Sequence, residues 1–275
     1  PVRGEVGRLR AGVRALLDVP EGHEVLVTVG GATAFWDAAV FGLIERRSQH
    51  AVFGEFSGKF AAAAAAAPWL EEPVLLQAEP GTRPDVAPVP DGVDVQALTH
   101  NETSTGVMQD PVRVDDALVV VDATSGAGAL PVDLNAVDVY YFSLQKGFAS
   151  DGGLTVAVAS PRALDRIGRI AASDRYIPAF LDLATVVDNS RKDQTYNTPA
   201  IATVVLARAQ IEAMLAEHGG LDRVVAEQRR KADHLYGWAE ARPWATPFVT
   251  DPAARSLVVA TVDLDGVDAN EVSGV

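Results

Sequence analysis

The sequence contains no cysteine, which excludes disulfides, thiolate metal sites and cysteine nucleophiles. Basic residues are also scarce, because 23 Lys and Arg stand against 37 Asp and Glu and give a formal net charge of -14. Nucleic acids and anionic membranes bind basic surfaces, so we expect neither as a partner. No apolar run approaches the length of a membrane span. We therefore expect a cytoplasmic protein.

Several sequence patterns of common enzyme classes are missing as well. The chain has no Gly-x-Ser-x-Gly elbow, which disfavours a hydrolase, and neither the dinucleotide nor the P-loop glycine pattern, which disfavours nucleotide binding. The five histidines have no paired ligand spacing, so no metal site is expected. They are His23, His50, His100, His218 and His234.

The hydrophobic pattern predicts an α/β fold. Apolar, β-prone runs predict strands at 25–29, 50–53, 74–76, 93–98, 117–122, 140–144, 154–158 and 256–262. Helical spacing predicts helices at 6–17, 34–44, 200–215 and 221–240, a surface helix at 61–67, and a helix that begins with Ser160 as its cap and Pro161 in its first turn. Strands that alternate with helices favour a mainly parallel sheet.

The domain organisation can also be predicted. We expect a large domain over residues 1–210 and part of a smaller C-terminal domain over residues 211–275. The chain begins with Pro1 in place of an initiator methionine, and its last residues, 270–275, look like the interrupted start of a helix. The sequence is therefore expected to be a piece of a longer protein, truncated at both ends.

Two charged residues follow predicted buried strands. Lys146 comes after the aromatic run 140–144, and Asp122 ends the run 117–122. A desolvated lysine amine can form a Schiff base, and a carboxylate can hold a pyridine nitrogen protonated, as pyridoxal phosphate requires. Lys146 could instead reach solvent and Asp122 could cap a turn. The small residues at 123–129 and Gly147 beside the lysine favour a cofactor site.

Three further features could bind a ligand or serve the fold alone. The turn Gly30-Gly31-Ala32-Thr33 could present backbone N–H groups and a helix N-terminus to an anion, or it could be a tight connection. The polar cluster 100–106 follows a strand, where α/β proteins often bind ligands, but it could equally be a capped turn. Phe56 could lie in the core or stack on a planar ring.

Five segments together carry a resemblance to a known family. They are GGATAFW at 30–36, HNETSTG at 100–106, VDATS at 121–125, YFSLQK at 141–146 and QTYNTP at 194–199. In this order they resemble the phosphoserine aminotransferases in their actinobacterial form, within the class V pyridoxal-phosphate aminotransferases. The resemblance covers essentially the whole chain. It implies the fold-type I architecture of pyridoxal phosphate enzymes (aspartate aminotransferase-like, three layers α/β/α in the large domain) and a homodimer with active sites at the subunit interface.

The resemblance also implies the cofactor, pyridoxal 5′-phosphate, and residues around its ring. Lys146 would form the Schiff base and move a proton between the Cα and C4′ carbons. Asp122 would pair with the pyridine nitrogen, and Thr103 would contact the region of the phenolic oxygen. Phe56 occupies the position of the aromatic residue that stacks on the ring, which is usually tryptophan in the family.

The phosphate of the cofactor would be held by five residues. The backbone at Ala32 and Thr33 would contact it together with the Gln145 side chain. Asn197 and Thr198 would reach it from the partner subunit. Many members carry an arginine at the position of Thr33, so backbone amides are expected to have a larger part here.

The implied reaction exchanges an amino group between glutamate/2-oxoglutarate and 3-phosphohydroxypyruvate/phosphoserine, in serine and pyridoxine biosynthesis. The partners would be small amino and keto acids. The family's residues for the substrate phosphate lie in segments that this chain does not contain. Two alternatives therefore stay open: another class V aminotransferase, of alanine–glyoxylate or serine–pyruvate type, and a catalytically incomplete dimerisation module. A cysteine desulfurase is excluded because its chemistry needs a cysteine.

Overall fold

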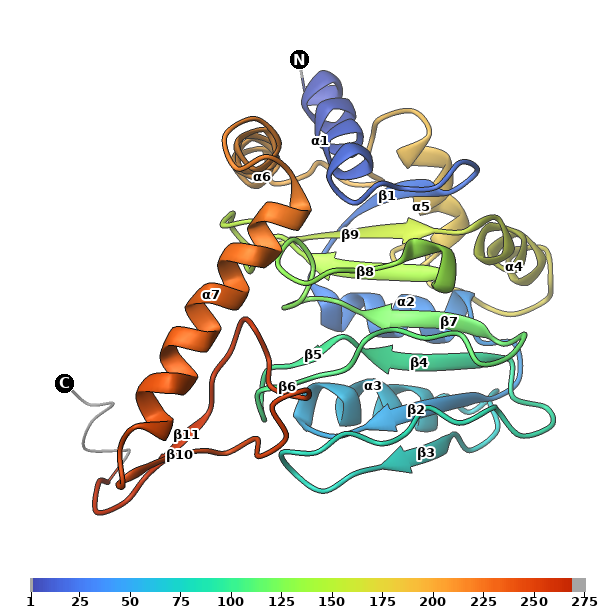
Figure 1. The fold of residues 1–275 in the computed structure, drawn as a ribbon. Coiled ribbons are helices and arrows are strands. Elements are labelled where there is room, and N and C mark those ends of the chain that lie inside the picture. The colour runs from blue at the N-terminus through green and yellow to red at the C-terminus, as the bar shows by residue number, and fades with distance from the viewer. Residues whose placement is uncertain (1, 269–275) are drawn as a thin grey trace.

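The structure, a computed structural model, describes residues 2–268 around a central sheet of seven strands (Figure 1). The strands are β1 (Glu24–Val29), β2 (Ser48–Val52), β3 (Val74–Gln77), β4 (Val95–Thr99), β7 (Leu118–Asp122), β8 (Val139–Ser143) and β9 (Leu154–Ala159). Their order across the sheet is β1-β9-β8-β7-β4-β2-β3. All neighbours from β8 to β3 are parallel, whereas β9 is antiparallel to both β8 and β1. The predicted α/β fold with a mainly parallel sheet is confirmed.

Helices cover both faces of this sheet. They are α1 (Val2–Leu16), α2 (Ala32–Gly42), α3 (Glu55–Ala65), α4 (Pro161–Ala171), α5 (Leu183–Ser190), α6 (Ile201–Ala216) and α7 (Leu221–Glu240), with a short 3-10 helix at Leu134–Ala136. Buried side chains of α1 and α6 share one hydrophobic cluster with the sheet, and those of α2, α3, α4 and α5 share another. The central sheet and the helices on its two faces therefore form three layers, α/β/α.

The central strand β8 joins these two clusters. Successive side chains of a strand point to opposite faces, so Tyr140 and Phe142 enter one cluster and Tyr141 enters the other. Tyr141 stacks on Phe35 of α2 with 4.3 Å between ring centroids. Phe142 stacks on Phe148 at 4.8 Å. Both faces of β8 are buried, which explains why its sequence is apolar without alternation.

The predicted start of α4 is confirmed. Ser160 is the N-cap, and its side chain accepts a hydrogen bond of 3.1 Å from the Ala163 N–H while Pro161 occupies the first helical position. The Ser160 hydroxyl also donates to Asp138 Oδ1 at 2.8 Å. The serine cap and the proline of the sequence thus mark where the helix begins.

Helix α3 is longer and more buried than expected. It begins at Glu55 instead of within the alanine run, and it ends at Ala65. Phe60, Ala61 and Ala64 are buried, so this is not a surface helix. Its early start places Phe56 in the first helical turn.

The strand predicted at 256–262 is wrong. The Ser256 Oγ accepts hydrogen bonds of 3.1 Å from the N–H groups of Val258 and Val259, which bends the chain directly after the serine. Only Val262 is in a strand, because β11 (Val262–Leu264) pairs with β10 (Ala245–Pro247) in a separate two-stranded sheet. A third sheet pairs β5 (Asn101–Glu102) with β6 (Val107–Met108).

Two more outcomes complete the comparison with the predicted elements. Helix α5 had not been predicted, and it begins at a side-chain cap, where Asp182 accepts from the Ala184 N–H at 2.9 Å. The helix start expected at 270–275 and the terminal Pro1 lie outside the described residues. Within residues 2–268, no helix is both long and apolar enough to cross a membrane.

Candidate functional site

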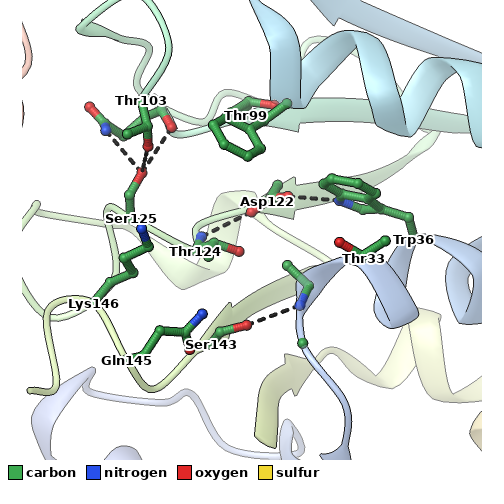
Figure 2. Close-up of a pocket in the computed structure, with 14 residues that line it drawn as sticks. Thr33, Trp36, Thr99, Thr103, Asp122, Thr124, Ser125, Ser143, Gln145 and Lys146 are labelled. Atoms are coloured by element: carbon green, nitrogen blue, oxygen red, sulfur yellow. Dashed lines mark hydrogen bonds between the residues drawn. The ribbon is translucent and has the colours of Figure 1, made fainter. Parts of the chain in front are cut away.

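A cavity of about 250 Å³ lies where β4, β7 and β8 end and α2 and α3 begin (Figure 2). In parallel sheets this edge is the usual place for a ligand, because loops leave the strands there and helix N-termini face it. The lining residues are Gly31, Ala32, Thr33, Trp36, Phe56, Thr99, Asn101, Thr103, Asp122, Thr124, Ser125, Ser143, Gln145 and Lys146.

Seven of the nine residues predicted for the site line this cavity. They are Ala32, Thr33, Phe56, Thr103, Asp122, Gln145 and Lys146. The other two, Asn197 and Thr198, do not line it and are exposed in the irregular segment between α5 and α6. The sequence had assigned these two to the cavity of a partner subunit.

Asp122 is the last residue of β7, and its side chain is 5% exposed. The indole Nε1 of Trp36 donates a hydrogen bond of 2.8 Å to its Oδ2, and the Thr124 N–H donates one of 2.9 Å to its Oδ1 (Figure 2). Burial raises the pKa of the Asp122 carboxyl, although the bonds from Thr124 and Trp36 act against this. A cationic group placed in the cavity would stabilise the carboxylate.

Lys146 is exposed, although a desolvated lysine had been considered from the sequence. It lies three residues beyond Ser143, the end of β8, in a turn where its side chain faces the cavity and solvent. The turn packs closely on the small-residue loop after Asp122, because a Cβ at Gly147 would lie 2.5 Å from the Ala127 carbonyl oxygen. The small residues noted in the sequence therefore let the lysine turn approach the β7 loop.

The N-terminus of α2 forms another wall of the cavity. Gly31 is the N-cap, so the first-turn N–H groups and the positive end of the helix dipole face the site. The Ala32 N–H donates a hydrogen bond of 3.0 Å to Ser143 Oγ (Figure 2). An anion at this point would share or replace that bond. The turn before the helix requires glycine at residue 30, because Gly30 has φ +106° and a Cβ there would lie 2.9 Å from the Ala34 Cβ.

A hydroxyl and amide cluster forms the wall that includes Thr103. Ser125 Oγ accepts hydrogen bonds from Thr103 Oγ1 at 2.8 Å and from Asn101 Nδ2 at 2.9 Å, and it donates to the Asn101 carbonyl at 3.1 Å. The buried Asn101 Oδ1 has no hydrogen-bond partner within residues 2–268. A buried polar atom without a partner is costly, so this atom favours a polar ligand in the cavity.

Sequence reasoning had not assigned several residues that line the cavity. Trp36 lies four residues after Ala32 and hence on the same face of α2, which is a signal that could have found it. Ser143 ends β8 just as Asp122 ends β7. Asn101, Thr124 and Ser125 belong to motifs that had been noted, but their contacts depend on how separate strands meet.

The lining fits pyridoxal 5′-phosphate. The cofactor presents an aldehyde, a ring nitrogen that can be protonated, a phenolic oxygen, a flat ring and a phosphate. The cavity offers an amine, a buried carboxylate with raised pKa, a polar cluster with an unpaired amide oxygen, an aromatic side chain and a helix N-terminus. Among residues 2–268 no three His, Cys, Asp or Glu side chains are grouped so that they could hold a metal ion.

A fold-type I architecture with a lysine and a buried aspartate at this edge is typical of the pyridoxal phosphate enzymes. The sequence pattern of the aminotransferase class-V family matches residues 4–275, and the chain belongs to this family. The predicted resemblance, the fold-type I architecture, the enzyme class (a pyridoxal-phosphate-dependent aminotransferase) and the cofactor are thereby confirmed.

Individual relatives give the closer relationship. The chain is 58% identical over 282 residues to a phosphoserine aminotransferase of Nocardioides sp., a match that covers all of this chain and 75% of the relative. It is 55% identical to the phosphoserine aminotransferase of Corynebacterium glutamicum, over 98% of this chain and 72% of the relative. A solved phosphoserine aminotransferase of Cytophaga hutchinsonii has a TM-score of 0.89 and 25% identity, over 99% of this chain and 76% of that one.

Proposed function

We propose that this protein is a phosphoserine aminotransferase, which exchanges an amino group between glutamate/2-oxoglutarate and 3-phosphohydroxypyruvate/phosphoserine. The geometric observation that carries the proposal is the cavity shared by Asp122, which ends β7, and Lys146, which lies in the turn three residues after the parallel neighbouring strand β8. The choice of substrate is supported by the 58% identity to the Nocardioides enzyme along the whole chain.

When bound, pyridoxal phosphate supplies an electron sink for negative charge that develops at the substrate Cα. In the proposed mechanism, the amine of Lys146 would hold the cofactor through its aldehyde and would also be the general acid and base that moves a proton between Cα and C4′. Asp122 would keep the ring nitrogen protonated, and Trp36 and the Thr124 N–H orient its carboxylate.

The remaining assigned residues bind and orient the cofactor. Phe56 would pack on the ring, and Thr103 would contact the region of the phenolic oxygen, since both line the cavity. The N-terminus of α2 at Ala32 and Thr33, together with the Gln145 side chain, would hold the phosphate. Together these residues would orient the cofactor with its ring nitrogen toward Asp122 and its aldehyde carbon toward Lys146.

We also propose that the protein is a cytoplasmic homodimer. Asn197 and Thr198 are exposed, which is compatible with their reaching the phosphate of a partner copy. Large apolar side chains are exposed in the same part of the chain, with Tyr196 at 53% and Ile201 at 43%. Such side chains suit a protein interface. The division into residues 1–210 and 211–275, and a role in serine and pyridoxine biosynthesis, belong to the same proposal.

The first experiment is an absorption spectrum of the protein with pyridoxal phosphate, before and after borohydride, followed by peptide mapping. A visible band that disappears on reduction, with the label on Lys146, is expected. Lys146→Ala should have neither the band nor the label. Absence of the band from the wild-type protein, or its persistence in Lys146→Ala, would contradict the proposed site.

A substrate comparison tests the choice within the family. With glutamate as amino donor, we expect faster transfer to 3-phosphohydroxypyruvate than to glyoxylate or pyruvate. A preference for glyoxylate would indicate an alanine–glyoxylate type enzyme. A protein that binds the cofactor but transfers no amino group would match the catalytically incomplete alternative.

A further inference from the structure

Glu102 is a buried carboxylate, 0% exposed, that follows Asn101 in the short strand β5. It does not line the cavity, but both of its oxygens accept hydrogen bonds from segments that do. Its donors are backbone N–H groups and serine hydroxyls. A buried carboxylate is costly unless such donors satisfy it, and once satisfied it holds them firmly.

The first segment is the start of α3. Glu102 Oε2 accepts from the Ser57 N–H at 2.9 Å and from the Ser57 hydroxyl at 2.8 Å, and Oε1 accepts from the Phe56 N–H at 3.3 Å. The N-cap of α3 is Gly54, which has no side chain to satisfy these N–H groups. Glu102 therefore caps α3 from a distance, with a negative charge at the positive end of the helix.

The second segment is the turn after β5. Glu102 Oε1 accepts from the Ser104 hydroxyl at 2.7 Å and from the Ser104 N–H at 3.3 Å. The Ser104 hydroxyl in turn accepts from the Glu55 N–H at 2.9 Å. Thr103, between Glu102 and Ser104, lines the cavity. One carboxylate thus links the helix that presents Phe56 to the turn that presents Thr103.

The packing leaves room for this carboxylate only because residue 54 is glycine. A Cβ at Gly54 would lie 2.3 Å from Glu102 Cγ and 2.5 Å from Ser104 Oγ. The φ of Gly54 is 175°, an extended conformation that any residue adopts, so the requirement for glycine is one of space. In contrast, a Cβ at Gly58, in the same helix, would meet only Val52 Cγ1 at 3.8 Å.

We propose that Glu102 is a positioning residue for the cofactor, which sets the spacing between Phe56 and Thr103 so that a planar ring enters a preformed slot. The inference rests on the proposed function. A slot that is already formed spares the cost of ordering two loops on binding, so its effect is on cofactor affinity. Because Glu102 acts through Phe56 and Thr103, it need not touch the ring.

The test measures the affinity for pyridoxamine 5′-phosphate by calorimetry. This form has an amine in place of the aldehyde, so its affinity reports the slot without the covalent link to Lys146. Glu102→Gln replaces one acceptor oxygen with a donor that faces other donors. Gly54→Ala forces the Glu102 side chain to move but keeps its charge and both of its acceptor oxygens. In both variants we expect the Kd to rise by about ten-fold or more. Gly58→Ala is the matched control and should keep the wild-type Kd.

Circular dichroism separates positioning from a role in folding alone. The far-ultraviolet spectrum monitors the fold, and the visible band of saturating pyridoxal phosphate monitors how rigidly the ring is held. We expect Glu102→Gln to keep the far-ultraviolet spectrum of the wild-type protein and to weaken the visible band. If it does not fold, Gly54→Ala carries the same test with the carboxylate retained. A folded variant with wild-type Kd and visible spectrum would overturn the inference, whereas a wild-type protein that binds neither form would overturn the proposed function itself.

Discussion

Trp36 Nε1 lies 2.8 Å from Asp122 Oδ2 and donates a hydrogen bond to it across 86 residues of sequence. The indole belongs to α2 and the carboxylate to the end of β7, so this bond joins the helix at the proposed phosphate end to the strand at the proposed ring-nitrogen end. With the Thr124 N–H on Oδ1, both oxygens are held in place. Four predictions start from this and neighbouring contacts.

Replacing Trp36 by Phe removes the donor and keeps most of the apolar volume. The pKa of Asp122, already raised by burial, should rise further, because one bond to its charged form is lost. The acidic limb of the pH–rate profile should therefore move to higher pH, and the rate of amino transfer should fall about ten-fold. Stopped-flow measurement of the reaction with glutamate at several pH values checks this. Trp69→Phe, at an exposed indole that packs on Phe41, is the control. An unmoved profile would count against the prediction.

Asp122→Asn keeps the shape of the side chain but cannot hold a charge opposite a protonated ring nitrogen. We expect amino transfer to fall by roughly a hundred-fold to a thousand-fold. In the ligand-free protein, the effect of this substitution on the stability of the fold depends on pH. The pKa of Asp122 is raised in the native state, so the stability that its protonated side chain contributes is present below the unfolded pKa and is lost as pH rises through the native pKa.

The Asn amide also places its NH2 group against the Trp36 indole N–H or the Thr124 N–H, and this cost is the same at every pH. The urea midpoint of ligand-free Asp122→Asn minus that of the wild-type protein should therefore be larger at pH 7 than near pH 4. Urea unfolding of both proteins at the two pH values tests this. The same midpoint difference at pH 7 and pH 4 would mean that ionisation of the buried Asp122 has no cost to the fold.

Two buried histidines make the fold sensitive to acid. Burial lowers the pKa of His50 to about 3 and that of His100 to about 4. Unfolded histidine titrates near 6.5, so the unfolded state binds more protons and the free energy of unfolding falls as pH drops below about 6.5. At pH 5 each histidine should lower this free energy by about 2 kcal/mol relative to pH 8.

Urea unfolding of wild type and His50→Gln at pH 8 and pH 5 measures this effect. The variant should lose about 2 kcal/mol less between the two pH values than the wild-type protein. His234→Gln, at an exposed histidine of α7, should behave as wild type. The same acid sensitivity in wild type and His50→Gln would assign the loss to other groups.

Gly147→Ala places a methyl group 2.5 Å from the Ala127 carbonyl oxygen, which is a backbone atom and cannot rotate away. The turn must shift, and Lys146 with it. We expect the borohydride-reducible band to form more slowly and amino transfer to fall by about a hundred-fold. Gly152→Ala, in the same loop, meets only the Gln145 side chain at 3.9 Å and should keep both. Comparable activity of Gly147→Ala and wild type would show that the close contact is not needed.

The sequence predicted correctly those elements that depend on residues close together in the chain. The strand that ends in Asp122, the cap at Ser160 and the helix 221–240 all follow from patterns within about twenty residues, and each is found in the structure. The seven predicted residues that share one cavity were assigned to a common site by the family resemblance, and the parallel strands bring their carboxyl ends to that edge.

The rest depended on contacts between distant segments. The bonds from Trp36 to Asp122 and from Ser57 to Glu102 span 86 and 45 residues, and no local pattern encodes them. The exposed position of Lys146 depends on how far the turn extends beyond β8. The failed strand at 256–262 had the right composition, but the hydroxyl of Ser256 offered the backbone a local alternative.

The antiparallel pairing of β8 and β9 has a consequence for how the site can change. It makes the segment from Leu144 to Gly153 a hairpin loop instead of a crossover, anchored at both ends in strands that are buried along their length. The loop is also joined to the turn before α2, since the Gly30 N–H donates to the Gly153 carbonyl at 2.9 Å and the Thr155 hydroxyl donates to the Gly30 carbonyl at 3.0 Å. An insertion or deletion here would disturb two functional loops and the middle of the sheet together. Natural variation in loop length is therefore expected at other edges of the cavity, where a loop can change without moving the lysine.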